Sequence, residues 1–489
     1  MNEHNLKKLG VKIGLEVHIQ LTNLRTKLFC GCSSDYRGKP PNSLMCPVCL
    51  GLPGSLPSLN KKAVEYAIMT SLALNAKISH YTLFYRKNYY YPDMPKNFQI
   101  SQYDKAGGIP ISTGGIVVIE VKNKKKTHKK EITITRMQIE EDPGRLTYPG
   151  TIDTAPYTLV DYNRAGICLL EIITDPVIKS PREARIFLQK LRSIMEHLGV
   201  DCSIEGAIRC DANVSIMGGN RVEVKNISSF KDVERALSHE VWRQEQSIKF
   251  QHDIPQETRH WAEKRKMTIS LRTKEEEHDY RYFPEPDLAP LNISQEKIDQ
   301  IKSELPELPD ERKIRLIKDY QLPAYNAEVI VSSKKLADFY EDCCKSYSDF
   351  KKVSDWVINE LLRRLNELNI DVSEVNITSN DLIKLLNFIE EGTIHNKTAK
   401  YVLEKMIKTE KKPEAIIDEE NLYRISDPKK IEKLVEKIFQ EHPKAVQDAL
   451  KHPKSKIFLV GQVMEISNHT VDPRILNEIV DKKLQQLKK

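Results

Sequence analysis

The sequence predicts an α+β protein in which a strand-rich first part is followed by an all-helical second part. Residues 11–290 hold short segments in which apolar and polar residues alternate, which is typical of half-buried strands. After Leu291 the alternation stops, and runs rich in Lys, Glu and Leu at helical spacing follow. The charged stretch Lys408–Pro413 ends in proline and indicates a further division. We therefore expect three domains, over 1–292, 293–408 and 409–489.

Each predicted helix and strand rests on a pattern in the sequence. Alternation and β-branched residues predict strands over 11–20, 115–121, 131–136, 207–216 and 221–225. Helices are expected over 59–74 and 180–198; the second starts with Ser180 as N-cap and Pro181 at the first helical position. The second part is predicted to form helices over 294–303, 309–320, 332–346, 353–369, 379–391, 398–408, 413–419, 428–442, 445–450, 455–464 and 473–488.

The composition indicates a globular protein without a membrane segment. The 489 residues include 76 Lys and Arg against 69 Asp and Glu, a net charge of +7, which permits an anionic partner without requiring one. The basic run 122–130 is predicted to be a solvated hairpin tip, with a nucleic-acid finger as the alternative. No apolar run approaches the roughly 20 residues that span a bilayer. With no secretory signal and an odd number of cysteines, nine, we expect a cytoplasmic protein with no membrane partner and no disulfide framework.

Four of the cysteines are candidate zinc ligands. Cys30-Gly-Cys32 and Cys46-Pro-Val-Cys49 form two pairs separated by 13 residues. Four thiolates satisfy tetrahedral Zn²⁺, and a closed four-sulfur site is structural rather than catalytic. The alternative is a set of four buried small apolar residues.

Three further patterns place acidic groups where a divalent cation could bind. In the segment Gly14–Gln20, Glu16 and His18 share one strand face while the apolar residues share the other. The segment Ile139–Gly144 contains three consecutive carboxylates, and Glu171 is the one charged residue of an apolar run. A solvated strand face and a structural ion pair are the alternatives.

Two neighbouring predicted strands indicate the wall of a polar cleft that could bind phosphates. Arg209, Asp211 and Asn213 alternate with apolar residues, and Glu223 and Lys225 do the same. A solvent-facing sheet is the alternative. The chain has no P-loop, dinucleotide-binding or serine-nucleophile motif, so any ATP must be bound through metal and basic side chains.

Long segments of the sequence resemble the B subunit of the aspartyl/glutamyl-tRNA amidotransferases. They run from residue 11 to about residue 470, so the resemblance covers nearly the whole chain. The matching segments are GLEVHIQL, the cysteine pairs with CLGLPGSLPSLN, RKNYYYPDMPKNFQISQYD, IEEDPGRL, LVDYNRAGICLLEI, IRCDANVSI, VEVKNISSF, TKEEEHDYRYFPEPDLAPL and FLVGQVM.

The resemblance implies a glutamine synthetase-like cradle, followed by a helical domain and a small helical tail that bind tRNA. The implied enzyme is a carbon–nitrogen ligase with glutamine as amide donor. ATP phosphorylates the side-chain carboxylate of misacylated Glu-tRNA(Gln) or Asp-tRNA(Asn), and ammonia then displaces the phosphate. The ammonia comes from glutamine hydrolysed in a partner amidase, the A subunit, and a small C subunit completes a heterotrimer. Which of the two tRNAs is used stays open.

The resemblance also assigns residues to a site. Mg²⁺ is expected on His18, Glu141 and Glu171, with Glu16 as a neighbouring catalytic candidate. Residues expected to contact ATP or substrate are Arg86, Lys87, Asn88, Arg209, Asp211, Asn213 and Lys225, and the expected zinc ligands are Cys30, Cys32, Cys46 and Cys49. A non-catalytic tRNA-binding scaffold is the alternative. A ligase acting on a small molecule is a weaker one, because it would not need the long helical extension.

Overall fold

The computed structural model describes residues 3–89, 94, 96–103, 107–122, 127–150, 155–204, 206–227, 229–273, 280–368, 370–467 and 470–488. The chain forms two compact units, Met1–Glu311 and Arg312–Lys489. The first is built around a large mixed sheet and the second is helical, which confirms the predicted α+β class. The two boundaries between the three predicted domains, at 292/293 and 408/409, stay predictions.

The strands of the first unit range from 2 residues in β2 to 15 residues in β8. They are β1 (Lys12–Gln20), β2 (Lys77–Ile78), β3 (Tyr81–Thr82), β4 (Tyr85–Asn88), β5 (Phe98–Ser101), β6 (Ser112–Thr113), β7 (Ile116–Lys122), β8 (Thr127–Glu141), β9 (Arg145–Thr147), β10 (Leu159–Asp161), β11 (Cys168–Thr174), β12 (Ile208–Ser215), β13 (Val222–Ile227), β14 (Glu257–Ala262), β15 (Met267–Thr273), β16 (Phe283–Pro284) and β17 (Leu291–Asn292).

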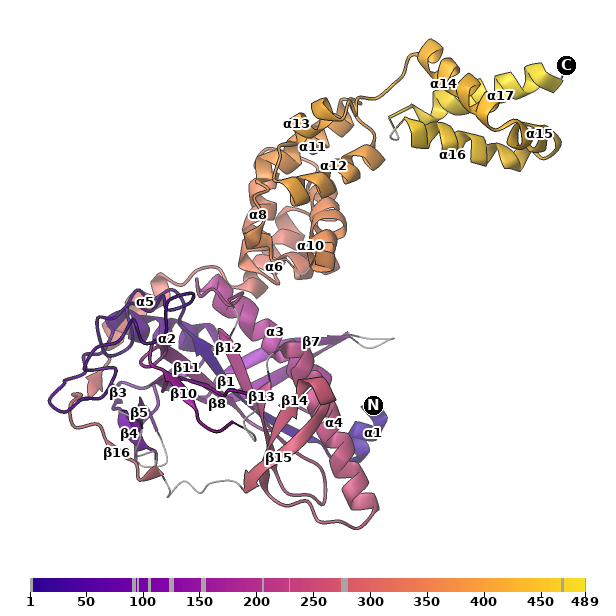
Figure 1. Ribbon diagram of the computed structural model, residues 1–489. Helices are drawn as coiled ribbons and strands as arrows, with labels where there is room; N and C mark the ends of the chain where they lie inside the picture. The colour runs from indigo at the N-terminus through magenta and orange to yellow at the C-terminus, as the bar shows by residue number, and fades with distance from the viewer. Residues whose placement is uncertain are drawn as a thin grey trace. The chain divides into compact units, whose positions relative to one another are not determined.

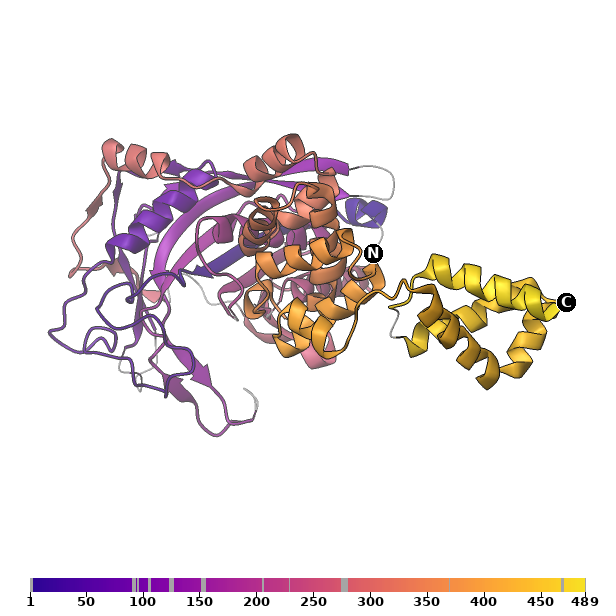
Figure 2. The same cartoon turned by 90° about the horizontal axis from the view of Figure 1, so that it is seen from above.

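Thirteen strands of the described chain belong to one sheet (Figure 1). Its main path runs β15-β14-β13-β12-β1-β11-β8-β5-β4-β16, while β2, β6 and β7 pair beside that path. Strand β13 pairs with β14 in parallel, and the central pairs of β1 with β11 and β12 are antiparallel. Figure 2 shows the long strands curving through this unit. The pairing of β7 with β8 confirms a hairpin around the basic run, although residues 123–126 at its tip lie outside the described residues.

Strand β1 has the two faces that its sequence predicts. Leu15, Val17 and Ile19 are completely buried. They belong to one apolar core together with residues of the helices α3 (Pro181–His197) and α4 (Phe230–Lys249), such as Phe187 and Leu237. The other face of β1 is therefore left for polar side chains.

The remaining helices of the first unit are α1 (Glu3–Lys8), α2 (Lys61–Ala73), the 3-10 turn η1 (Glu263–Arg265) and α5 (Gln295–Ser303). Helix α3 begins as predicted: the Ser180 hydroxyl accepts from the backbone N–H of Glu183 at 3.2 Å, and Pro181 follows the cap.

The second unit is a succession of helices with two apolar clusters, which extend over residues 316–422 and 431–484. Its helices, with α6 leading into it, are α6 (Pro309–Asp319), α7 (Ala324–Ile330), α8 (Lys334–Cys344), α9 (Phe350–Asp355), the π-helix η3 (Trp356–Leu362), α10 (Arg363–Leu368), η4 (Val372–Glu374), α11 (Ser379–Glu390), α12 (Asn396–Thr409), α13 (Pro413–Glu419), α14 (Pro428–Glu441), α15 (Pro443–Lys451), η5 (Pro453–Ser455), α16 (Lys456–Ile466) and α17 (Pro473–Lys488).

The predicted helices of this unit are observed, with 353–369 divided into α9, η3 and α10, and the described chain adds the short elements α7, η4 and η5. None of the helices described is both long enough and apolar enough to cross a bilayer.

Candidate functional site: an acidic group in a polar cleft

The polar face of the central strands lines a cleft of about 930 Å³. Strands β1, β8, β11, β12 and β13 all contribute side chains to it, because residues of one parity point to the same face of a sheet. The predicted site residues that line it are Glu16, His18, Lys87, Glu171, Arg209, Asp211 and Lys225.

Three side chains meet at the centre of this cleft. Nε2 of His18 lies 3.2 Å from Oε1 of Glu140 and 3.6 Å from Oε1 of Glu171. One potential ligand atom from each residue lies within 4.8 Å of the others. The strand register explains part of this convergence, because His18 on β1 stands directly opposite Glu171 on β11.

The buried carboxylates of Glu140 and Glu171 need a positive charge close to them. Burial by itself lowers the pKa of His18, but Glu140, Glu171 and Asp211 outweigh it and raise the pKa to about 9. Burial and the charge of Glu140 raise the pKa of Glu171 to about 7. Burial also opposes ionisation of Glu140, but the hydrogen bond and charge of His18, the charge of Lys87 and the hydrogen bond from Ser101 together outweigh it and lower its pKa. A protonated imidazole or a divalent cation can supply the charge that the two carboxylates need.

Glu141 does not join this group, so the structure does not bring together all three residues of the expected ligand set. Its Oε1 accepts from Nζ of Lys96 at 2.5 Å and from the backbone N–H of Ile100 at 3.0 Å, and its side chain is 1% exposed. Burial raises the pKa of Glu141, and the charge of Lys96 only partly offsets this. Glu140 occupies the position that was expected for Glu141. Its side chain points to the same face of β8 as that of Gln138, which stands directly opposite Glu171.

Arg86 also lies away from the cleft. Its guanidinium forms two hydrogen bonds with Glu285, at 2.8 and 2.5 Å, and stacks 4.1 Å from the ring centroid of Phe98. Together with Lys96 and Glu141 it lines a second cavity of about 170 Å³. Arg86 therefore lies outside the main cleft, and its contact with ATP or substrate stays a prediction.

Lys87 points into the cleft, where an aromatic wall surrounds it. Its Nζ lies 4.6 Å from the ring centroid of Tyr280. Tyr282 stacks in parallel on Tyr103 with centroids 3.9 Å apart and contacts Tyr280 edge to face. Asn88 supports this wall, because its Nδ2 donates to the carbonyl of Arg281 at 2.9 Å.

Charge pairs fix the opposite wall. Nζ of Lys225 lies 3.0 Å from Asp211 and 3.4 Å from Glu223, and Glu223 accepts in turn from the hydroxyl of Thr258 at 2.9 Å. Asn213 donates to Glu16 at 2.8 Å. The predicted residues of β12 and β13 thus lie together, and their individual roles stay predictions.

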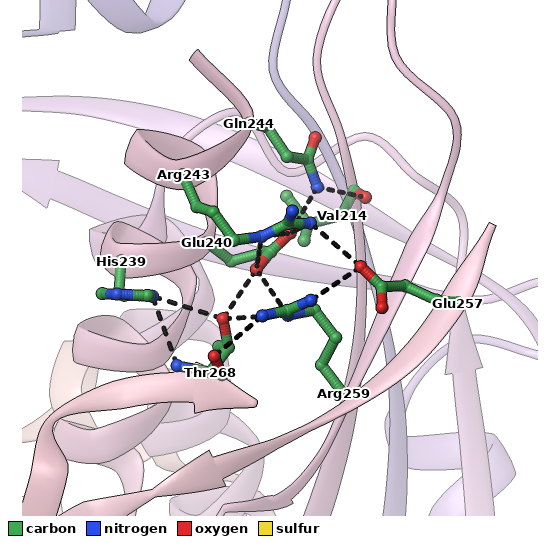
Figure 3. A network of polar contacts seen from close by, with 8 residues as sticks. All are labelled: Val214, His239, Glu240, Arg243, Gln244, Glu257, Arg259 and Thr268. Carbon is green, nitrogen blue, oxygen red and sulfur yellow. Dashed lines mark hydrogen bonds and ion pairs between the residues drawn. The ribbon is translucent and has the colours of Figure 1, made fainter. Parts of the chain in front are cut away.

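A buried polar network supports this wall from behind. Figure 3 shows Glu240 of α4 at its centre, completely buried, bonded to Arg243 at 2.6 Å and to the Thr268 hydroxyl at 2.8 Å. Arg259 of β14 lies 3.5 Å from Glu240 and donates to Glu257 at 2.7 Å. The network attaches β14 and β15 to α4, so the strand that carries Thr258 is held in place.

The four predicted zinc ligands converge. One sulfur from each of Cys30, Cys32, Cys46 and Cys49 lies within 4.8 Å of the others, and none of the nine cysteines is in a disulfide. The hydrogen bond from Cys30, then the N–H of Cys46 and the charge of Lys27, lower the pKa of Cys49 to about 4. Donor number and spacing fit tetrahedral Zn²⁺.

Comparison with known proteins identifies the class first. A family model described as the GatB/GatE catalytic domain matches residues 11–299, and one described as the GatB domain matches residues 338–484. The α+β unit thus belongs to the class of GatB/GatE catalytic domains.

Relatives that match over nearly their full length identify the family within this class of protein. The aspartyl/glutamyl-tRNA(Asn/Gln) amidotransferase B subunit of Saccharolobus solfataricus is 49% identical over 97% of this chain and 99% of its own length. The B subunits of the same name from Carboxydothermus hydrogenoformans and Thermotoga maritima are 47% and 46% identical, over 99% and 97% of this chain and 100% and 98% of their own lengths. The chain belongs to the family of aspartyl/glutamyl-tRNA(Asn/Gln) amidotransferase B subunits, which confirms the resemblance seen in the sequence.

Proposed function

We propose that the cleft is where ATP activates the side-chain carboxylate of a misacylated tRNA, Glu-tRNA(Gln) or Asp-tRNA(Asn), for amidation. The observation that carries this proposal is the group His18, Glu140 and Glu171, set among the cations Lys87, Arg209 and Lys225 in one cleft. A carboxylate is a poor electrophile, and phosphorylation gives it a leaving group. Phosphoryl transfer depends mainly on positioning and on neutralising charge.

The donor set fits a hard divalent cation. Two carboxylates and one imidazole nitrogen converge in a buried place that needs positive charge, and oxygen-rich sites of this kind suit Mg²⁺. Mg²⁺ bound there would neutralise charge on the phosphates during transfer. Glu16 lies on the same face and stays a neighbouring candidate ligand.

The chain's own residues then have separable tasks. His18, Glu140 and Glu171 bind the cation, while Lys87, Arg209 and Lys225 pair with phosphate oxygens. The substrate carboxylate attacks the γ-phosphorus and ADP leaves. Ammonia next attacks the acyl carbon, phosphate leaves, and one proton is lost to give the amide.

We further propose that ammonia comes from glutamine hydrolysed in a partner amidase, the A subunit, and that a small C subunit completes a cytoplasmic heterotrimer. The relatives' names support a multi-subunit enzyme acting on tRNA(Asn/Gln). In the same proposal the first unit is a glutamine synthetase-like cradle, the helical unit binds the tRNA, and Zn²⁺ on the four cysteines is structural.

Reconstitution with the partner chains tests this function. The assay measures glutamine-dependent amidation of each misacylated tRNA while ATP and Mg²⁺ are varied. We expect no amide without ATP; amide formed without ATP would contradict the phosphorylated intermediate. Glu171→Gln should keep tRNA binding and lose ATP turnover, whereas a non-catalytic scaffold would show no ATP turnover that depends on Glu171.

A further inference from the structure

Three consecutive carboxylates at the end of β8 point to three different places, and the third, Asp142, is in neither cavity. Its side chain is 2% exposed. Oδ2 accepts from Nε of Arg164 at 2.8 Å and from NH2 of Arg209 at 2.5 Å, and Oδ1 accepts from the backbone N–H of Gly144 at 3.2 Å. Both oxygens are used inside the protein, so Asp142 is not placed to contact a ligand.

Arg209, in contrast, is placed to do so. It lies on β12 directly opposite His18 of β1, and residues paired in this way have Cα atoms about 5 Å apart. Its side chain is 42% exposed and lines the cleft. A guanidinium carries five donors, so a bond through one NH2 leaves donors that can face phosphate oxygens beside the proposed cation.

Arg164, the second partner of Asp142, is carried by a segment that the cysteine-bearing loop holds. Asn163 accepts from the backbone N–H of Leu44 through Oδ1 at 2.7 Å. Nζ of Lys27, which is completely buried, donates to the carbonyl of Tyr162 at 3.1 Å. The position of Arg164, and through it the orientation of the Asp142 carboxylate, is thereby restrained from outside the cleft.

The charges of Asp142, Arg164 and Arg209 show which of these groups is available to a ligand. A buried carboxylate needs at least one cation, and Arg164 alone could supply it. Because a second guanidinium shares the same oxygen, the three charged groups together carry one net positive charge, and Arg209 is the member that faces the cleft. An arginine held in this way loses less conformational freedom when it binds an anion than a free arginine does.

We propose that Asp142 is a positioning residue that directs the Arg209 guanidinium toward the phosphates of ATP. The inference rests on the proposed function and adds to it one residue that acts only through another. Arg209 is expected to contact phosphate of ATP rather than of tRNA, because it stands opposite a residue of the proposed cation site.

The test is a double-mutant cycle in the assembled enzyme, with KM for ATP, KM for misacylated tRNA and kcat of ammonia-dependent amidation as readouts. Asp142→Asn should raise KM for ATP about tenfold and change kcat less than about twofold. Arg209→Gln should raise KM for ATP by about thirtyfold or more. The double variant should match Arg209→Gln within about twofold, because Asp142 has nothing left to position. Asp142→Ser, with a smaller uncharged side chain, replaces the first variant if that one does not fold.

Asp232→Asn is the matched control, since Asp232 is also buried and pairs with an arginine, Arg235, on α4 outside the cleft. It should leave KM for ATP unchanged. Effects of Asp142→Asn and Arg209→Gln that multiply, an unchanged KM for ATP, or a rise only in KM for tRNA would each overturn the inference. A wild-type enzyme that makes amide without ATP would instead overturn the proposed function, so the two failures are distinguishable.

Discussion

Glu140 and His18 meet across strands that are not neighbours: Oε1 and Nε2 lie 3.2 Å apart although β11 runs between β8 and β1. The contact passes over the face of β11, on which Glu171 stands opposite His18 and Leu169 stands opposite Glu140. One buried carboxylate is therefore supplied by each of two adjacent strands. Glu141, the next residue along β8, turns to the opposite face and pairs with Lys96.

This separation of Glu140 from Glu141 gives the first prediction. Glu140→Gln should weaken Mn²⁺ binding, used as a probe for the divalent site, by about tenfold or more, because one charged ligand is lost. Glu141→Gln should leave Mn²⁺ affinity within about twofold but lower the free energy of unfolding by about 3 kcal/mol, because Lys96 stays buried without its partner. Mn²⁺ titration followed by electron paramagnetic resonance, with thermal melts, measures both. The converse pattern would show that the cation belongs to Glu141.

Alternation in the sequence predicts that Glu140 lies on the polar face of its strand, although the resemblance assigned Glu141 to the metal site. Met137 and Ile139 are completely buried, and Gln138 and Glu140 alternate with them. Period-two alternation alone therefore assigns Glu140 to the polar face. Asp142 has the same parity, and which of the two approaches Glu171 depends on the register of β8 against β11, which a local pattern in one strand does not specify.

Other parts of the site could not be read from local patterns. The parity of β1, β12 and β13 correctly predicted one polar face, because alternation is a property of each strand alone. The stacking of Tyr103 on Tyr282 and the pairing of Arg86 with Glu285 each join residues more than 170 positions apart. Such contacts depend on the topology of the chain, so no local pattern in the sequence predicts them.

The second prediction concerns pH. The pKa of His18 is raised to about 9 and that of Glu171 to about 7, so protons compete with a cation for both groups below these values. Mn²⁺ affinity should therefore rise with pH, by up to about tenfold per unit between pH 7 and 9 and more steeply below pH 7. Titrations at pH 6.5, 7.5 and 8.5 check this. In His18→Gln the rise above pH 7 should disappear; a pH-independent wild type would contradict the proposed ligand set.

The third prediction concerns the proposed zinc site on Cys30, Cys32, Cys46 and Cys49. Lys27 is completely buried, and its Nζ lies 3.6 Å from Sγ of Cys49 and 2.8 Å from the carbonyl of Leu44. Its charge offsets part of the charge of four thiolates. Lys27→Met should weaken Zn²⁺ binding about 10- to 100-fold, as loss of a group that bonds a metal ligand commonly does.

Zinc release to a chromogenic chelator measures this effect. Lys39→Met is the control, since Lys39 is an exposed lysine between the two cysteine pairs and should not alter the release. Equal release rates in Lys27→Met and the wild type would mean that the lysine only fills space.

The fourth prediction concerns the stability of the helical unit. Glu341 of α8 accepts from Nε of Arg312 at 2.7 Å and from NH1 of Arg315 at 2.6 Å, both on α6. Burial opposes its ionisation, but the two arginines outweigh this and lower its pKa. A group whose pKa is lower in the folded than in the unfolded state stabilises the fold above its unfolded pKa, and this contribution is lost as the pH falls through the folded pKa.

The contact between α6 and α8 should therefore weaken as the pH falls below about 4, near the pKa of an unperturbed glutamate. Glu341→Gln should remove about 2 kcal/mol at pH 7 and flatten this acid dependence. Hydrogen exchange of the α6 and α8 amides reports the local effect, which a melt of the whole chain would mix with unfolding of the first unit. Glu367→Gln, which breaks an exposed pair with Arg363, should change exchange in α6 and α8 very little. If both variants protect these amides equally and keep the acid dependence, the ion pairs of Glu341 contribute nothing to holding the two helices together.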